Sequence, residues 1–224
     1  MPGENRRGRA GEKWLIGYAR ERKEKLKAGA VEPSVVIPVN QAFPAAQKVL
    51  SDGQVLDIFR RAKVIARTSC LCRTKVKGCN APRDVCIVLD KAARERLEKG
   101  TARRITIDDA RAVLDETACH GLVHLTIYDR GHVPKAICSC CSCCCHDLRA
   151  ILDLGNPEMV LESDFVARRN EKKCQDCGKC VERCRFGAFR QEAGKVSFDR
   201  KKCFGCGLCV MSCPGKALKL TRRA

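Results

Sequence analysis

One pattern of four cysteines occurs twice near the end of the chain and constrains the fold of that region more than any other feature. Cys174 begins a run with the spacing C-x2-C-x2-C-x3-C, and Cys203 begins a second run with the same spacing. The offset between the two runs is 29 residues, and the same offset aligns Gly178 with Gly207. Because the register extends beyond the cysteines, a duplicated structural unit is the simplest explanation.

The same spacing, closed by Pro214 after the second run, is the cysteine signature of bacterial ferredoxins. Residues 170–220 therefore resemble the two-cluster, bacterial-type ferredoxin domain. In that family three cysteines of each run hold one [4Fe-4S] cluster, and the fourth cysteine holds the other cluster. The resemblance implies two [4Fe-4S] clusters, one held by Cys174, Cys177, Cys180 and Cys213, the other by Cys203, Cys206, Cys209 and Cys184.

One position departs from the family pattern. Arg185 follows Cys184, where the family usually has proline. We expect this difference to affect the potential of the nearby cluster and not its presence. Structural zinc is the competing interpretation, since zinc also uses C-x2-C units, but each zinc site takes its four ligands from two separated pairs.

A second group of ten cysteines lies upstream and has no regular repeat. It opens at Cys70-Leu71-Cys72-Arg73, and six of its members fall within residues 138–145. Six thiols exceed what one tetrahedral ion can use, so the pattern favours a polynuclear centre. The candidate metal ligands are Cys70, Cys72, Cys79, Cys86, Cys138, Cys140, Cys141, Cys143, Cys144 and Cys145. We expect the first four to share metal with some of the last six.

The identity of this upstream centre stays open between three alternatives. An additional iron-sulfur cluster is the first choice, and zinc or soft-metal binding by the thiols are the others. Residues 64–155 are also similar to the N-terminal region of longer iron-sulfur binding proteins of anaerobes, described as 4Fe-4S dicluster-domain proteins. The C-x-C-R start, the segment from Gly78 to Cys86 and the dense run Cys138–Cys145 carry this similarity.

Metal is favoured over disulfides for these thiols. The N-terminus has an arginine pair but no apolar stretch of signal-peptide length, so we expect a cytoplasmic protein, where clustered thiols are usually metal ligands. Adjacent cysteines such as Cys143 and Cys144 also suit disulfide geometry poorly. No apolar run is long enough to predict a membrane span.

The order of apolar and turn-forming residues predicts an α+β fold. We expect a basic arm over residues 1–45, a cysteine-rich α+β domain over 46–156 and a two-cluster ferredoxin domain over 157–224, with a boundary at Gly155-Asn156-Pro157. Helices are expected around Trp14–Leu26 and over 52–62, 91–99, 106–120 and 146–154, and strands over 64–66, 85–89 and 122–127. Thr106 and Asp109 form a capping-box pattern at the start of the fourth helix, and Cys119 near its end is expected to be a small buried residue. On the last helix, Leu148, Ile151 and Leu152 are expected to face inward.

Positive charge is concentrated at the two ends of the chain. Residues 1–27 hold nine Lys and Arg against four acids, and residues 166–224 hold sixteen against five. Basic residues surround the cluster loops, and they predict a redox protein partner with an acidic docking surface; they are Lys172, Lys173, Lys179, Arg183, Arg185, Lys201 and Lys202. Nucleic-acid binding is not favoured, because the chain has only ten aromatic residues for base stacking.

Together these patterns predict an iron-sulfur electron-transfer protein or subunit. Its two [4Fe-4S] clusters would relay single electrons to or from the upstream centre. The alternative is a reductase whose upstream iron-sulfur centre reduces a disulfide or another small substrate. Nucleotide chemistry is unsupported, since the chain has neither G-x-G-x-x-G nor a Walker pattern, and no catalytic residue is predicted.

Overall fold

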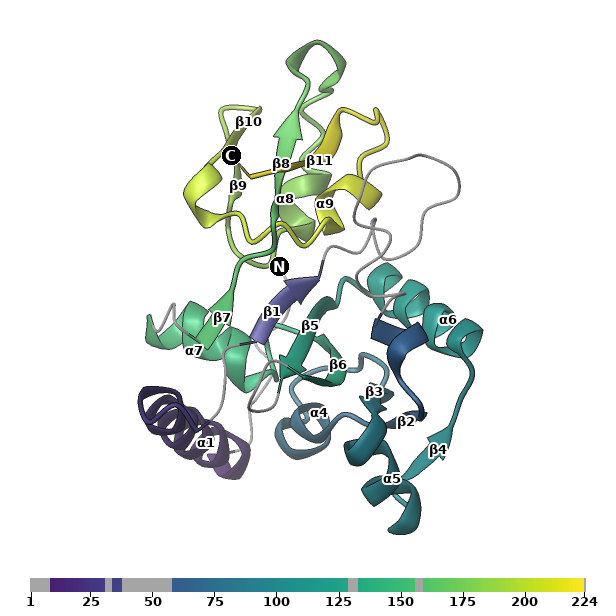
Figure 1. Ribbon diagram of the computed structural model, residues 1–224. Helices are drawn as coiled ribbons and strands as arrows, with labels where there is room; N and C mark the ends of the chain where they lie inside the picture. The colour runs from purple at the N-terminus through teal and green to yellow at the C-terminus, as the bar shows by residue number, and fades with distance from the viewer. Residues whose placement is uncertain (1–8, 31–33, 38–57, 129–132, 156–158, 224) are drawn as a thin grey trace.

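A computed structural model describes residues 9–30, 34–37, 58–128, 133–155 and 159–223, and the statements below concern these residues. Helices and mainly antiparallel sheets alternate along the chain, which confirms the α+β class. Figure 1 shows a larger part built around one sheet and a smaller part, formed by the end of the chain, that lies against one side of it.

The larger part contains a seven-stranded sheet in the order β4-β2-β3-β6-β5-β1-β7. Neighbouring strands are antiparallel except β1 and β7, which are parallel. The strands are β1 Ser34–Ile37, β2 Ile65–Ser69, β3 Asp84–Leu89, β4 Ala102–Arg104, β5 Val123–Tyr128, β6 Pro134–Cys140 and β7 Val160–Leu161. The three strands expected from sequence are present as β2, β3 and β5, whereas the central strand β6 was not predicted.

Strand β6 matters because it carries cysteines into the middle of the sheet. In its antiparallel pairing with β3, Ile137 lies opposite Ile87, so Cys138 follows at the position next to Cys86 on the neighbouring strand. On its other side β6 pairs with β5, and Cys138 faces Leu125 across that ladder. Two segments that are about fifty residues apart in sequence thus bring thiols to the same end of the sheet.

Helices cover this sheet and mostly begin and end where the sequence signals predict. They are α1 Arg9–Lys27, α4 Leu71–Val76, α5 Asp90–Glu98, α6 Ile107–Cys119 and α7 His146–Leu154. The capping box before α6 is formed, with the Asp109 backbone N–H donating to Thr106 Oγ1 at 3.1 Å and the Thr106 N–H donating to Asp109 Oδ2 at 2.9 Å.

Other helices differ in part from the sequence predictions. The helix expected over 52–62 is seen at residues 58–61, and residues 52–57 lie outside the described part of the chain. Leu152 was expected to face inward on α7, but it is 40% exposed, whereas Leu148 is fully buried. Helix α4 was not predicted, since its N-cap residue Cys70 supplies no side-chain cap.

Helix α1 packs against the larger part instead of standing apart from it. Leu15 and Ala19 are buried, and the Arg22 Nε lies 2.7 Å from Asp147 Oδ1 on α7. In Figure 1 this helix lies beside α7 and α4. The rest of the expected arm, residues 1–8, 31–33 and 38–45, lies outside the described residues.

The smaller part has the two-fold internal repeat expected from the cysteine runs. Strand β8 Phe165–Arg169 pairs with β11 Leu218–Arg222, and β9 Phe189–Glu192 pairs with β10 Lys195–Phe198. Short helices α8 Lys179–Arg183 and α9 Leu208–Met211 each follow a glycine with positive φ, Gly178 at 74° and Gly207 at 79°. Both positions use the left-handed conformation that glycine adopts without strain.

The two parts share a core and specific hydrogen bonds. Apolar residues of β5 and α7, including Leu125 and Leu148, pack in one cluster with Phe186 and Leu208 of the smaller part. Strand β7 also pairs with β1, so residues beyond the expected boundary at 156 complete the larger sheet.

Arg185, the residue that departs from the ferredoxin pattern, lies at this junction. Its Nε donates to the Gly121 carbonyl at 3.1 Å, and the neighbouring Arg183 Nη2 donates to the Cys119 carbonyl at 2.7 Å. The end of α6 is therefore held by two arginines of the smaller part.

Candidate iron-sulfur and thiolate centres

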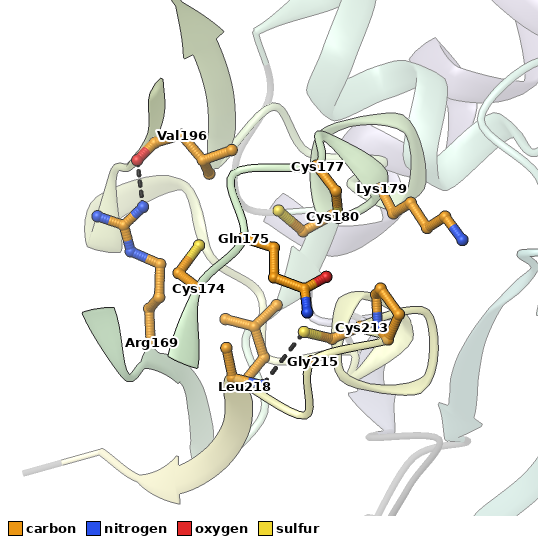
Figure 2. Close-up of a pocket in the computed structure, with 12 residues that line it drawn as sticks. Arg169, Cys174, Gln175, Cys177, Lys179, Cys180, Val196, Cys213, Gly215 and Leu218 are labelled. Atoms are coloured by element: carbon orange, nitrogen blue, oxygen red, sulfur yellow. Dashed lines mark hydrogen bonds between the residues drawn. The ribbon is translucent and has the colours of Figure 1, made fainter. Parts of the chain in front are cut away.

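The first ferredoxin pocket is lined by cysteines from both repeats. Three come from the first run and the fourth, Cys213, comes from the end of the second; Figure 2 shows Cys174, Cys177, Cys180 and Cys213 around one hollow. The remaining wall is largely aliphatic and includes Val196 and Leu218. The structure thus brings together the four cysteines that the family rule groups.

The second pocket has the complementary membership. It is lined by Cys203, Cys206, Cys209 and Cys184, together with Phe186 and Phe204. The two hollows are similar in size, as expected for sites that hold the same kind of group. The donor sets and the space between them fit one [4Fe-4S] cluster in each pocket.

Hydrogen bonds from backbone N–H groups to cysteine sulfur occur at equivalent positions of the two repeats. The Ala188 N–H donates to Cys184 Sγ at 3.2 Å, and the Ala217 N–H donates to Cys213 Sγ at 3.2 Å. These two bonds, 29 residues apart, fix the crossed fourth thiol in each pocket. Hydrogen bonds to ligand sulfur are one of the ways in which a protein sets a cluster potential.

The two pockets differ in exposure. In the first, Cys177 is exposed, whereas Cys203, Cys206 and Cys209 of the second are all buried. Burial raises the pKa of the Cys206 thiol to about 12, with the backbone N–H of Leu208 acting in the opposite direction. The first pocket therefore faces the surface, and the second faces the larger part.

The ten upstream thiols form two groups and not one. In the first, here called the six-thiol ring, each thiol lies close enough to two others to shift their pKa values, in the closed order Cys70, Cys72, Cys145, Cys140, Cys138 and Cys86. It combines the start of α4, the strands β3 and β6, and the N-cap of α7. Cys70 and Cys86 thus lie close to Cys138.

Neighbouring thiols of the ring shift the pKa of one another in alternating directions. Hydrogen bonding to ring neighbours lowers the pKa of Cys70 to about 2 and that of Cys138 to about 5, and it lowers the pKa of Cys145 well below the usual value. The same bonds raise the pKa of Cys72, Cys86 and Cys140. Thiolates held this close to one another are suited to binding metal, which takes the deprotonated sulfur.

The second group, here called the four-thiol set, comprises Cys79, Cys141, Cys143 and Cys144. All four Sγ atoms lie within 4.8 Å of one another. Cys141 and its neighbours occupy the turn between β6 and α7, and Cys79 follows α4. Hydrogen bonds from Cys143 and Cys144 lower the pKa of Cys141.

Arg73 lies between the upstream thiols and the sheet. Its side chain is only 1% exposed, and its Nη1 donates to the Ser139 carbonyl at 2.8 Å and to Cys141 Sγ at 3.8 Å. In the sequence, Arg73 is marked only by its place in the C-x-C-R motif. A charged residue between clustered cysteines is the sequence signal by which Arg73 could have been predicted as a residue of the site.

The six-thiol ring is continuous with the second ferredoxin pocket. Cys140 and Cys145 of the ring lie in the same apolar cluster as Phe186 and Cys206, with Cys184 and Phe204 packed against it. The rings of Phe186 and Phe204 are stacked with centroids 4.3 Å apart. A shared apolar core therefore connects one set of thiols to the other.

Two residues outside the thiol groups, Cys119 and His146, were also considered from the sequence, and the structure shows their surroundings. Cys119 was expected to be a small buried residue, but it is exposed at the end of α6. The ring of His146, next to Cys145, packs against Tyr18 of α1 at a tilt of 34° with centroids 4.1 Å apart, and its Nδ1 lies 2.9 Å from Asp147 Oδ1. These contacts account for His146 without a role as a metal ligand.

Comparison with known proteins identifies the smaller part. Residues 173–218 match the family model of the 4Fe-4S dicluster domain. No curated protein matches the chain. Among the described residues no helix combines the length and apolar character needed to span a bilayer. The dicluster domain and the grouped cysteines together support an iron-sulfur electron-transfer role.

Proposed function

We propose that the two dicluster-domain sites relay single electrons between an external partner and a further iron-sulfur centre held by the six-thiol ring. The observation that carries this proposal is the shared apolar core of the ring and the second pocket, where Cys140 and Cys145 pack with Phe186 and Cys206. The clusters would supply the one-electron chemistry. The chain supplies their positions and a water-poor path between them.

The difference in exposure gives the relay a direction in space. The first pocket includes the exposed Cys177 and would exchange electrons with the partner, whereas the buried second pocket would exchange them with the ring. Lys172, Lys173, Lys201 and Lys202, all exposed, lie on the turns that precede the two cysteine runs. They support a partner with an acidic docking surface.

The first test is the content of iron and acid-labile sulfide in the full chain, purified anaerobically. Two [4Fe-4S] clusters account for about eight irons, so we expect more than that number, with the excess lost in Cys145→Ser and kept in the exposed control Cys119→Ser. Iron that stays at about eight per chain in the parent protein would refute a ring-bound iron-sulfur centre.

The second test follows the path of the electron. In Cys206→Ser the second cluster should be lost, and reduction of the ring centre through the exposed first cluster should slow at least tenfold in rapid-freeze electron paramagnetic resonance. Cys119→Ser again provides the control. Unchanged reduction of the ring centre in Cys206→Ser would show that electrons do not pass through the second pocket.

A further inference from the structure

We propose that the four-thiol set is a separate site for one tetrahedral divalent ion of the zinc class, distinct from the six-thiol ring and without a redox role. This inference does not depend on the proposed electron relay. It divides the ten upstream thiols between two metal sites of different chemistry.

Sulfur–sulfur distances carry the argument. Cys79 Sγ lies 3.7 Å from Cys141 Sγ and 3.9 Å from Cys144 Sγ, and the Sγ atoms of Cys143 and Cys144 are 3.8 Å apart. A tetrahedral zinc ion with zinc–sulfur bonds of about 2.3 Å separates its ligands by about 3.8 Å. These three sulfur–sulfur distances therefore match the edge of a single-ion tetrahedron, and all four sulfur atoms lie within 4.8 Å of one another.

The space around the four thiols also fits one ion better than a cluster. The cysteines of each ferredoxin pocket line an open hollow. Here the thiols contact one another, and a Cβ added at Gly78 would lie 3.0 Å from Cys144 Sγ and 3.3 Å from the Cys143 carbonyl oxygen. Glycine at position 78 thus lets the backbone approach the thiols closely.

Arg73 provides an independent indication of bound negative charge. Within the described part of the chain, its Nε and Nη2 are buried and have no hydrogen-bond partner. A buried guanidinium with unused N–H groups is costly unless an anion lies nearby. A divalent ion with four thiolates carries a net charge of −2, and Arg73 Nη1 already lies 3.8 Å from one of those sulfurs, Cys141 Sγ.

The strand geometry separates this site from the ring. Successive side chains at the end of β6 point to opposite faces, so Cys138 and Cys140 share one face and Cys141 starts on the other. Leu15, with Trp14 packed beside it, covers the four-thiol set from α1, in a cluster that also contains Val76. A covered site with four protein ligands and no open position is the arrangement of structural zinc.

The direct test is made on the full chain, produced anaerobically with both zinc and iron supplied. We expect one zinc per chain, and zinc X-ray absorption should show four sulfur neighbours at about 2.3 Å. Absence of zinc, or nitrogen or oxygen ligands in its shell, would overturn the proposal. This measurement needs no variant, so a folding defect cannot obscure it.

Variants then assign the ion to these residues. Cys79→Ser and Cys143→Ser should each lose most of the zinc while iron and sulfide per chain stay within a tenth of the parent values. Cys119→Ser should keep all three. Loss of iron instead of zinc in Cys143→Ser would place these thiols in the iron-sulfur centre and overturn the division, whereas a failed electron relay would leave the zinc result unchanged.

Discussion

The two cysteine-rich regions of this molecule differ in how sequence neighbours are used. In the ferredoxin runs, three consecutive cysteines line one pocket and only the fourth crosses to the other. In the upstream run, the adjacent Cys140 and Cys141 belong to different groups. A tight loop converges its side chains on one centre, whereas the end of a strand alternates them between two faces.

The largest expected effect is the loss of a whole cluster, and it tests whether the fourth cysteine of each ferredoxin run crosses to the other pocket. Cys184→Ala should remove about four irons and the same spectroscopic signal that Cys206→Ala removes, because both thiols line the second pocket. Cys177→Ala should remove the other signal. If Cys184→Ala and Cys177→Ala eliminate the same signal, the fourth ligands do not cross between the repeats.

The next prediction concerns the tight packing of the four-thiol set. Gly78→Ala should lower the free energy of unfolding by about 1–3 kcal/mol, since overpacking a filled site costs that amount, and should speed zinc loss to a chelator. The matched control is Gly17→Ala, whose added Cβ meets nothing within 4 Å. Thermal unfolding of both variants measures the difference, and equal stabilities would argue against close packing at position 78.

Acid should affect the larger part through His124. This residue is fully buried on β5 with its Nε2 3.1 Å from Thr117 Oγ1, and burial lowers its pKa from 6.5 to about 4. The folded state favours the neutral form of His124. The contribution of His124 to the free energy of unfolding is therefore complete above pH 6.5 and declines as the pH falls toward 4. Proton linkage therefore lowers the free energy of unfolding by about 2 kcal/mol at pH 5 relative to its value above pH 6.5.

Comparison of His124→Gln with the parent protein isolates this effect from acid damage to metal sites. The difference in unfolding free energy between pH 7.5 and pH 5 should be smaller in the variant. A parallel pH dependence in both proteins would show that His124 is not responsible.

Arg185 tests the junction between the two regions. Arg185→Pro, which restores the residue usual in ferredoxins, removes the bond to the Gly121 carbonyl and should weaken docking by about 1.5 kcal/mol, within the range for charged hydrogen bonds. Hydrogen exchange at the end of α6 should increase. Arg190→Ala, at an exposed position on β9, is the control; faster exchange in the control alone would contradict the assignment.

The smallest expected effect concerns the surface near the first pocket. Replacing Lys172, Lys173, Lys201 and Lys202 by Gln should slow electron exchange with an acidic redox protein several-fold at low salt and little at high salt. The matched control replaces the exposed Lys91 and Lys99 on and after α5. Rates that are independent of ionic strength would remove the docking argument.

Sequence alone predicted the features that depend on local spacing. The 29-residue repeat, the capping box at Thr106 and the strands β2, β3 and β5 all follow from short-range patterns. Strand β6 did not, because its Cys and Ser residues lack the β-branched character that marks a strand. The division of the upstream thiols depends on that strand, so it could not be predicted either.

Arg73 shows the same limit at the level of one side chain. The sequence places a cation between cysteines, but only the fold shows that it is buried with two unused nitrogen atoms. The effect of Arg185 on the potential of the nearby cluster stays a prediction, and the fold adds that this side chain donates a hydrogen bond to the larger part. Long-range contacts decide such roles, and no local pattern specifies them.

Helix α1 shields part of both upstream groups of thiols. Leu15 and Trp14 pack in the apolar cluster that contains Cys141 and Cys144, and Tyr18 lies against His146 beside Cys145 of the ring. Cys144 and Cys145 are both buried. A segment near the start of the chain thus helps to exclude solvent from thiols that come from its middle.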